Sequence, residues 1–482
     1  TAINSGTLNI QHANALGSTA AGTTISSGAA LEIQGGISSA ESFTVSGTGI
    51  SNGGAIRNIS GTNTLSGGIS LAGATSIQSV SGGLTLSGSV TSASGTQTLT
   101  IGGGSVTMSG GNNTVDIVVN GGTLFARGGG WATSFAAGRT ITVNTGGTLD
   151  TTTPTLGGLG GATRPANIVI NEDAIWKLNN EQQLPTTALT LYAGIVNGPG
   201  EVRGGGTIAT TAHATKSSVI NAPLSTGNGA ITFNVANGAV ATDLSVTGNI
   251  GGGNGITKSG SGTMSMNGTG TYTGATAVNV GQLNVNGSIT SATSVASGAF
   301  LGGDGSITGA VSLSGTLLPG QGGTTDRSLT INGNVTTTTG SPLSFTVTSM
   351  ASHDQLIIGG GSSIGLNNAD LAVDFDNSLS FDILGAGEGD DFLAQLDSFS
   401  GTGSWFKLIS GTTTGMFSNV TNTMTSGDLA YYGLTGTQYT VNIEGQTFWV
   451  AQGSTYLVAI PEPRAALIGS IGLLMLLRRR RR

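Results

Sequence analysis

Short runs in which an apolar residue alternates with Ser or Thr recur along most of this chain. Residues 69–71, 84–86, 99–101 and 106–108 are examples. A period of two residues indicates β-strands that bury one face, and the 85 glycines among 482 residues allow tight corners between them. Strand signals that return about every 8 to 12 residues fit either an antiparallel sandwich or a solenoid.

Internal repeats favour the solenoid. The opening residues 1–10, TAINSGTLNI, return at residues 276–285 as TAVNVGQLNV, with six of ten positions identical, and weaker copies lie at residues 119–124 and 143–149. One such unit cannot cover its own apolar face, whereas stacked units can. An Asn at the turn can also hydrogen-bond an Asn one coil away. The sequence therefore predicts an all-β fold, with a right-handed parallel β-helix over residues 1–325.

Composition indicates how the predicted β-helix is stabilised and which partners it does not bind. Charged residues make up 8% of the chain and cysteine is absent, yet hydrophobic residues reach 37%. That apolar content argues against disorder, and without disulfides the stability must come from backbone ladders and a stacked core. Six of the 16 basic residues lie in the last 19 positions, so the remaining 10 face 23 acidic residues. A body this acidic argues against nucleic acid as a partner.

The chain changes character after the repeats. Between Arg327 and Lys407 there is no Lys or Arg, whereas carboxylates accumulate and aromatic residues become denser. We expect residues 326–457 to form an acidic, β-rich C-terminal domain or cap, since a solenoid needs an atypical unit over its last coil. The loop at residues 385–391 has the oxygen ligands that calcium prefers, but it is a single copy. The sequence leaves open whether the acidic region 354–397 binds calcium, and we assign no metal site.

The last residues, 458–482, have three parts in a fixed order. A Pro-Glu-Pro tripeptide precedes an uncharged run at residues 465–477, and five arginines end the chain. The run makes about 20 Å of helix against about 30 Å of hydrocarbon, so we expect a single short apolar helix that needs help to span. Arginines stay on the cytoplasmic side, which predicts that everything upstream is exported. The expected sorting signal consists of Pro461, Glu462, Pro463, Arg478, Arg479, Arg480, Arg481 and Arg482.

This tail resembles the PEP-CTERM sorting signal of Gram-negative bacteria, with the family motif on Pro461, Glu462 and Pro463. The resemblance implies recognition by an exosortase, a membrane-embedded processing enzyme, and transient insertion in the inner membrane. It also implies a host that makes exopolysaccharide, which is a candidate partner.

A second resemblance lies in the body. Lys258, the glycine-rich turn after it and residues 271–274 (TYTG) are similar to the autotransporter-associated β-strand repeat, with Met264 and Met266 in place of two leucines. This resemblance implies a β-helical body whose repeats are structural units without activity of their own.

The repeat region lacks the residue pattern of a polysaccharide-degrading enzyme. Glycoside hydrolases need two carboxylates about 5 to 10 Å apart, yet the carboxylates of the repeat region stand alone in the sequence. The histidines, His12, His213 and His353, are far apart and have no acidic partner at a useful repeat distance. We therefore predict a protein that is not an enzyme, without catalytic residues or cofactors.

The predicted function is that of an exported surface or extracellular-matrix structural protein in biofilm or adhesion. The alternative is a carbohydrate-active β-helix enzyme, a polysaccharide lyase or hydrolase. Thr1 aligns inside a repeat, so we expect the chain to be the C-terminal portion of a longer protein. On the alternative reading, the enzyme site lies in the missing N-terminal part.

Overall fold

The chain forms two compact units, one of residues 1–283 and 287–291 and the other of residues 284–286 and 292–482. The computed structural model describes residues 1–111, 113–127, 138–151, 167–179, 182–183, 189–320, 328–349, 352–367, 370–375, 407–410, 412–414, 420–424, 437–443, 446–452 and 456–461. Within these ranges the helical structure is one 3-10 turn, η1 (Ile50–Asn52). The predicted all-β class is thereby confirmed.

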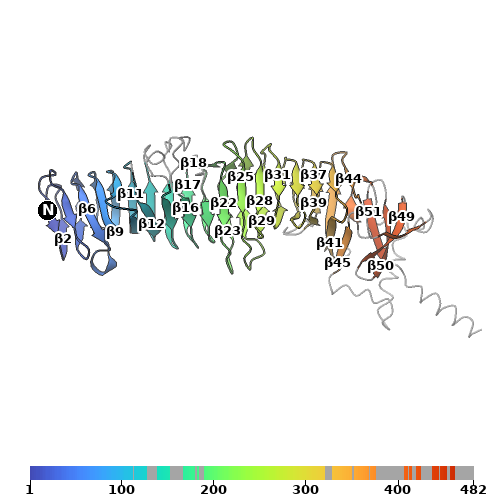
Figure 1. Ribbon diagram of the computed structural model, residues 1–482, viewed down its shortest axis with the longest axis horizontal. Coiled ribbons are helices and arrows are strands. Elements are labelled where there is room, and N and C mark those ends of the chain that lie inside the picture. Colours follow the sequence, from blue (N-terminus) through green and yellow to red (C-terminus); the bar gives the residue numbers. More distant parts are fainter. Residues whose placement is uncertain are drawn as a thin grey trace, which may run out of the picture. The chain divides into compact units, whose positions relative to one another are not determined.

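Unit 1 is a parallel β-solenoid, as predicted (Figure 1). Each strand pairs in parallel with a strand of the next coil, as β4 (Ala30–Ile33) does with β7 (Ile56–Asn58). The hydrogen bonds between coils join residues at different separations, such as 20 positions between Thr263 and Asp243 and 28 positions between Thr226 and Asn254. The coils therefore differ in length while their strands stay in register.

The strands of unit 1 form four parallel ladders, named A to D. Ladder A contains β1 (Ala2–Ile3), β3 (Thr23–Ile25), β6 (Phe43–Gly47), the start of β9 (Ile69–Leu86) and β10 (Val90–Ser92). Ladder B contains β2 (Thr7–Ile10), β4, β7, the middle of β9, β11 (Thr98–Met108), β12 (Asp116–Asn120), β14 (Thr140–Val143), β16 (Asn167–Ile170), β19 (Leu189–Leu191), β22 (Thr207–Thr210), β25 (Ile231–Asn234), β28 (Ile256–Ser259) and β31 (Thr276–Val278).

Ladder C follows ladder B along the chain in each coil. It contains β5 (Ser38–Ser39), β8 (Thr62–Leu65), the ends of β9 and β11, β13 (Gly122–Ala126), β15 (Gly147–Thr151), β17 (Ile175–Leu178), β20 (Ile195–Asn197), β23 (Ser218–Ile220), β26 (Leu244–Val246) and β29 (Thr263–Met266). Ladder D contains β18 (Gln182–Gln183), β21 (Val202–Arg203), β24 (Leu224–Ser225), β27 (Ile250–Gly251), β30 (Thr269–Gly270) and β33 (Ser288–Ile289).

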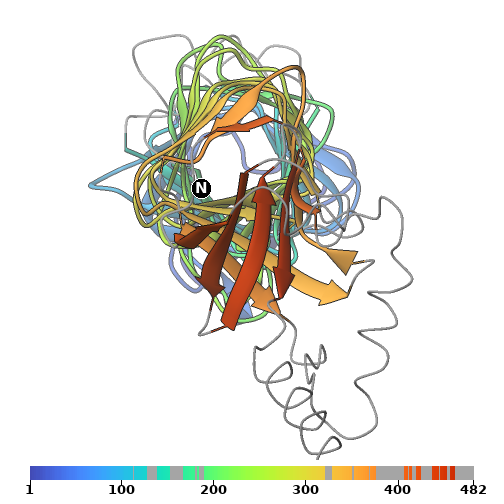
Figure 2. The ribbon, with the colours of Figure 1, turned by 90° about the vertical axis from the view of Figure 1, so that its right-hand side faces the viewer.

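Parallel register stacks equivalent side chains into columns inside unit 1. In the end-on view of Figure 2 its coils, blue to green, superimpose around a common interior. One buried column of ladder B is Leu31, Ile56, Ile77, Ile101, Val119, Val143, Ile170 and Leu191, each opposite the next. Because an aliphatic residue meets another one coil away, every coil buries the apolar face of its neighbour.

The repeat copies found in the sequence occupy different corners of the coil. Residues 1–10 form β1 and β2, which belong to ladders A and B, whereas residues 276–285 contain β31 of ladder B and β32 (Gln282–Val285). Each copy nevertheless folds as strand, tight turn and strand, with Gly6 at φ 73° and Gly281 at φ 70°. The predicted stacking of Asn on Asn occurs where Asn171 Nδ2 donates to Asn144 Oδ1 at 2.7 Å.

Unit 2 begins with parallel pairing and ends with antiparallel pairing. Apart from the antiparallel pair of β41 and β42, parallel pairs join the strands up to β47. By contrast, β48 to β51 pair antiparallel in sequence order, and β51 pairs antiparallel with β46. The expected boundary at residues 325 and 326 stays a prediction. The strands are β34 (Thr293–Val295), β35 (Phe300–Gly303), β36 (Ser306–Ile307), β37 (Val311–Leu313), β38 (Thr316–Pro319), β39 (Ser328–Ile331), β40 (Val335–Thr337), β41 (Pro342–Ser349), β42 (Ser352–His353), β43 (Gln355–Ile358), β44 (Ser363–Gly365), β45 (Asp370–Phe375), β46 (Lys407–Ser410), β47 (Thr412–Thr414), β48 (Val420–Met424), β49 (Thr437–Ile443), β50 (Gln446–Gln452) and β51 (Tyr456–Pro461).

Gly6 and Gly281, which occupy the same turn in the two repeat copies, give a matched test of coil stacking. A Cβ at Gly281 would lie 2.5 Å from the carbonyl oxygen of Gly260 and 2.6 Å from that of Gly262, whereas a Cβ at Gly6 would meet nothing within 4 Å. We expect Gly6→Ala to lower the free energy of unfolding by about 1 kcal/mol through left-handed strain alone. Gly281→Ala adds a backbone clash and should cost about 3 kcal/mol. Urea denaturation measures both, and equal losses would contradict the stacking at this corner.

Candidate functional site

The structure reaches only the first residue of the expected sorting signal. Pro461 is the last residue of β51 and lies opposite Phe448 of β50. Proline has no backbone donor, so the end of a strand is a position that suits it. Glu462, Pro463 and Arg478 to Arg482 lie outside the described residues, as does the apolar run. Among the residues that are described, no helix is long and apolar enough to cross a bilayer. The sorting signal therefore stays a prediction.

Two carboxylates of unit 1 accept hydrogen bonds from backbone amides. Asp116 Oδ1 accepts a hydrogen bond from the amide of Thr140 at 2.9 Å. Asp243, which is buried, accepts from the amides of Gly238 at 2.6 Å and Thr263 at 2.8 Å. Carboxylates used in this way fix corners between coils. In the described ranges, no three His, Asp or Glu side chains are grouped so that they could hold a metal ion.

The expectation that the histidines lack an acidic partner was wrong for His213. Its Nε2 lies 3.6 Å from Glu172 Oε1, although the two residues are far apart in sequence. His213 Nδ1 accepts hydrogen bonds from the amides of Thr215 and Lys216, so Nε2 carries the proton that faces the carboxylate. The contact arises because corner loops of separate coils stack on one another. It could be predicted from the sequence only if the register between coils were known.

Lys216 pairs with both carboxylates of the corner cluster formed by Glu172, Asp173, His213 and Lys216. Lys216 Nζ lies 2.9 Å from Glu172 Oε1 and 2.6 Å from Asp173 Oδ2. Hydrogen bonding and charge attraction from Lys216 lower the pKa of the Glu172 carboxyl, and both carboxylates raise the pKa of Lys216. A carboxylate held in this way is a poor proton acceptor. The cluster thus ties corners together and does not resemble an acid–base pair.

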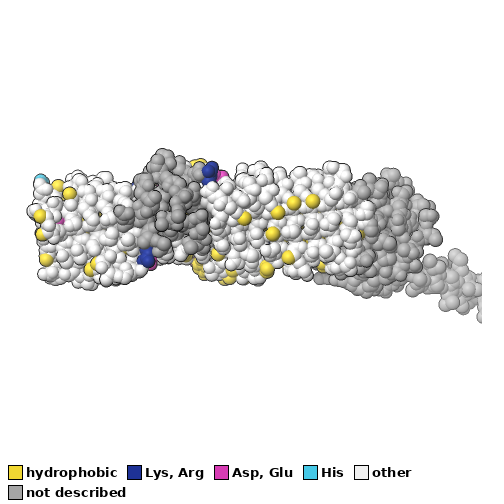
Figure 3. Space-filling model, turned by 45° about the horizontal axis from the view of Figure 1, so that its top comes forward, with side chains coloured by type: hydrophobic (Ala, Val, Ile, Leu, Met, Phe, Trp, Pro, Cys, Tyr) yellow, Lys and Arg dark blue, Asp and Glu magenta, His cyan; other side chains and the backbone are white. Residues whose placement is uncertain are grey.

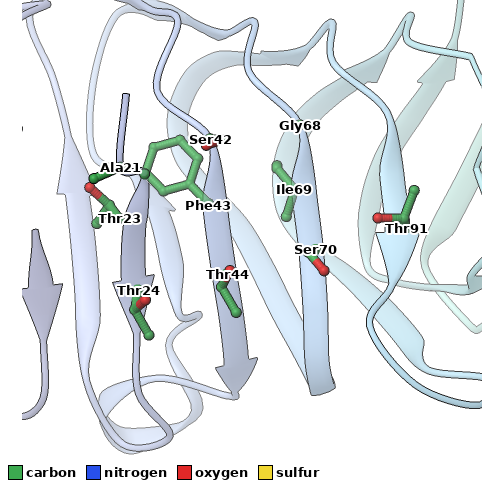
Figure 4. A pocket seen from close by; sticks show the side chains of 11 residues that line it. Ala21, Thr23, Thr24, Ser42, Phe43, Thr44, Gly68, Ile69, Ser70 and Thr91 are labelled. Carbon is green, nitrogen blue, oxygen red and sulfur yellow. The ribbon is translucent and has the colours of Figure 1, made fainter. Parts of the chain in front are cut away.

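A shallow groove of about 310 Å³ lies on the outer face of ladder A. Figure 4 shows hydroxyl groups of Thr24, Thr44, Ser70 and Thr91 on four successive strands, and these residues are in register across the coils. The buried side chains of Phe43 and Ile69 are also part of its lining. None of the lining residues is charged, so this groove can exchange hydrogen bonds but offers no general acid or base.

Lys258 is the one lysine side chain that is fully buried in the part of the chain that the structure describes. Its Nζ donates to the carbonyl oxygens of Ser259 at 3.0 Å and Gly260 at 2.8 Å in its own coil. It also donates to Val280 at 3.0 Å in the next coil. Burial lowers the pKa of the ammonium to about 8, and the Asp243 carboxylate acts in the opposite direction. Lys258 thus binds carbonyl oxygens of two coils at a corner, beyond the ends of the paired strands.

The lowered pKa predicts how stability depends on pH. An unfolded lysine titrates near 10.4, so between about pH 8 and 10.4 the unfolded chain binds more protons than the folded chain. Stability contributed by this residue must therefore rise with pH across that window, by at most about 3 kcal/mol. In Lys258→Met this increase disappears, while the other titrating groups remain. Urea denaturation of both proteins at pH 7, 8, 9 and 10 measures the difference, and parallel pH profiles would contradict the assignment.

Comparisons with known proteins do not assign this chain to a family. No protein-family model matches the chain, and no curated protein matches its sequence. The two resemblances drawn from the tail and from residues 258–285 therefore rest on the residues quoted for them. Function is inferred from the solenoid, its outer surface and the sequence of the tail.

Proposed function

We propose that this protein is an exported, non-enzymatic structural component of the cell surface or extracellular matrix. The observation that carries the proposal is the parallel β-solenoid of unit 1, whose outer positions hold small hydroxylated side chains. Thr64, Thr85 and Thr107 stand in register on the outside of ladder C, as Thr24 and Thr44 do on ladder A. A stack of coils whose strands pair from one coil to the next suits a scaffold.

The surface chemistry supports a scaffold more than an enzyme. The part of the face in Figure 3 that is described is mostly white, which marks backbone and side chains that are neither charged nor hydrophobic, and charged groups appear at few places on it. The polar side chains that line the groove of ladder A are hydroxyls, and Asp116, Asp243 and Glu172 are engaged by amides or by lysine. Such a surface hydrogen-bonds water and hydroxylated polymers without acid–base chemistry. Such a surface is compatible with a role in biofilm or adhesion and with exopolysaccharide as partner, which the resemblance of the tail suggests.

The finer parts of the proposal come from the sequence of the tail. An exosortase-type enzyme recognises Pro461, Glu462 and Pro463 while the short helix of residues 465–477 sits transiently in the inner membrane. The terminal arginines hold that helix in place from the cytoplasmic side. Residues 326–457 are proposed as an acidic, β-rich C-terminal domain or cap, and the β-helix is proposed to be right-handed.

The sorting proposal is tested by changing the terminal arginines and the Pro-Glu-Pro tripeptide of the tail in separate variants. Replacing Arg478 to Arg482 with Ser, or Pro461-Glu462-Pro463 with Ala, should leave unprocessed protein in a host with an active exosortase. Arg464→Ser is the matched control: it removes one positive charge on the other side of the apolar run and should leave processing intact. Mass and cell fractionation of the product report the outcome. Normal trimming of both tail variants would contradict the proposal.

Enzymatic activity within residues 1–482 is tested on the purified chain. We expect no product from a panel of neutral and acidic polysaccharides, because the solenoid offers hydroxyl grooves and engaged carboxylates. Reducing-end assays detect hydrolysis, and absorbance of unsaturated products detects lyase activity. Measurable turnover in either assay would overturn the structural role.

A further inference from the structure

Glycines hollow the groove of ladder A at every second strand. The residues directly before β3, β6, β9 and β10 are Gly22, Ser42, Gly68 and Ser89, and the strands that follow them are in register. A Cβ on Gly22 would lie 2.9 Å from Ser42 Oγ, and a Cβ on Gly68 would lie 3.7 Å from Ser89 Oγ. The two glycines therefore leave hollows beside serine hydroxyls, two strand spacings or about 10 Å apart.

A row of hydroxyls runs along the same groove. Thr24, Thr44, Ser70 and Thr91 stand on four successive strands, as Figure 4 shows. Among the described residues, no protein group hydrogen-bonds these four hydroxyls, so each can donate to and accept from a ligand. Threonine on a strand is stiff at χ1, so a ligand that binds the row orders little that was mobile before.

The charge around the groove favours a neutral ligand. None of the residues that line it is charged. A carboxyl group lies beside it, because Thr23 Oγ1 of the lining donates to Glu41 Oε1 at 2.6 Å, and Glu41 is 2% exposed. An anion in the groove would find no basic side chain among the lining residues and would lie near this carboxyl group. Every lining residue falls within residues 21–91, a stretch that the structure describes without a gap.

From this geometry we infer that the groove of ladder A binds a neutral β-1,4-linked polysaccharide that lies across the strands with one sugar on each. In such an extended chain each sugar advances by little more than the strand spacing of about 4.8 Å. Successive rings are also flipped, so hydroxymethyl groups appear along one edge at every second sugar. Gly22 and Gly68 recur with that period and give these groups room, while ring hydroxyls meet the row of Thr and Ser. The inference deepens the proposed matrix role, from which it takes a polysaccharide as the partner.

The first test compares ligands on the unaltered purified chain by titration calorimetry. Cellohexaose should bind, and affinity should rise from cellobiose to cellotetraose and then level off, since the groove spans four strands. Xylohexaose has the same linkage without hydroxymethyl groups, so it should bind about fivefold more weakly or worse. Maltohexaose has the same sugar in an α-linked chain that coils, so it should bind more weakly still.

The second test fills one hollow and removes one hydroxyl. Gly68→Ala should weaken cellohexaose binding about fivefold or more, because the methyl group occupies space that the ligand needs. The matched control is Gly83→Ala on the outer face of ladder C: neither glycine has a positive φ, and their Cβ atoms would meet nothing closer than 3.7 and 3.9 Å. Thr44→Val should weaken binding about threefold to tenfold through one lost hydrogen bond. Thr85→Val, on ladder C, should change nothing.

The outcomes separate this groove from the wider proposal. The site is wrong if cellohexaose does not bind, or if Gly68→Ala and Thr44→Val bind it as well as the wild type does. Equal binding of xylohexaose or maltohexaose would also overturn the inference, because the glycine hollows would then play no part in selection. An oligogalacturonate that bound as tightly would contradict the neutral ligand. The ligand series uses the wild-type chain, so it does not depend on how the variants fold. Sorting by the tail is measured in cells, and failure at this groove leaves that result untouched.

Discussion

Parallel backbone hydrogen bonding between successive coils is the constraint on which unit 1 depends. Each strand has its donors and acceptors met by the coil before and the coil after, so the backbone is satisfied without help from charged side chains. The same register forces equivalent residues into columns, as in Leu31, Ile56 and Ile77. An interior built this way tolerates a chain with few charges and no disulfide, because each added coil supplies its own ladder and its own apolar contact.

Corners are where that constraint is broken, and the buried polar side chains gather there. Lys258 donates to carbonyl oxygens of two coils, and Asn58 Nδ2 does the same with Gly61 and Ser81. Asp243 performs the opposite task by accepting from two amides. These residues satisfy backbone groups that no ladder can reach. Their polarity therefore serves the fold, and the chemistry available to a ligand lies on the outer faces instead.

The outer faces of unit 1 divide into two kinds of surface. Hydroxyl rows such as Thr24, Thr44 and Ser70 offer weak, repeated hydrogen bonds, whereas Arg127 and Lys177 offer concentrated charge.

The sequence by itself determined the fold class. Two-residue alternation, glycine corners and repeated segments each indicate stacked β-coils, because they reflect local geometry that the coil imposes on every turn. The tail motif is also a property of sequence order and needs no fold to be recognised. By contrast, the pairing of His213 with Glu172, and of Asp150 with Arg127 and Lys177, was decided only by tertiary structure. Coil lengths vary, and even the matching segments 1–10 and 276–285 occupy different corners, so the residue that faces a given side chain one coil away is set by strand register and not by a fixed repeat.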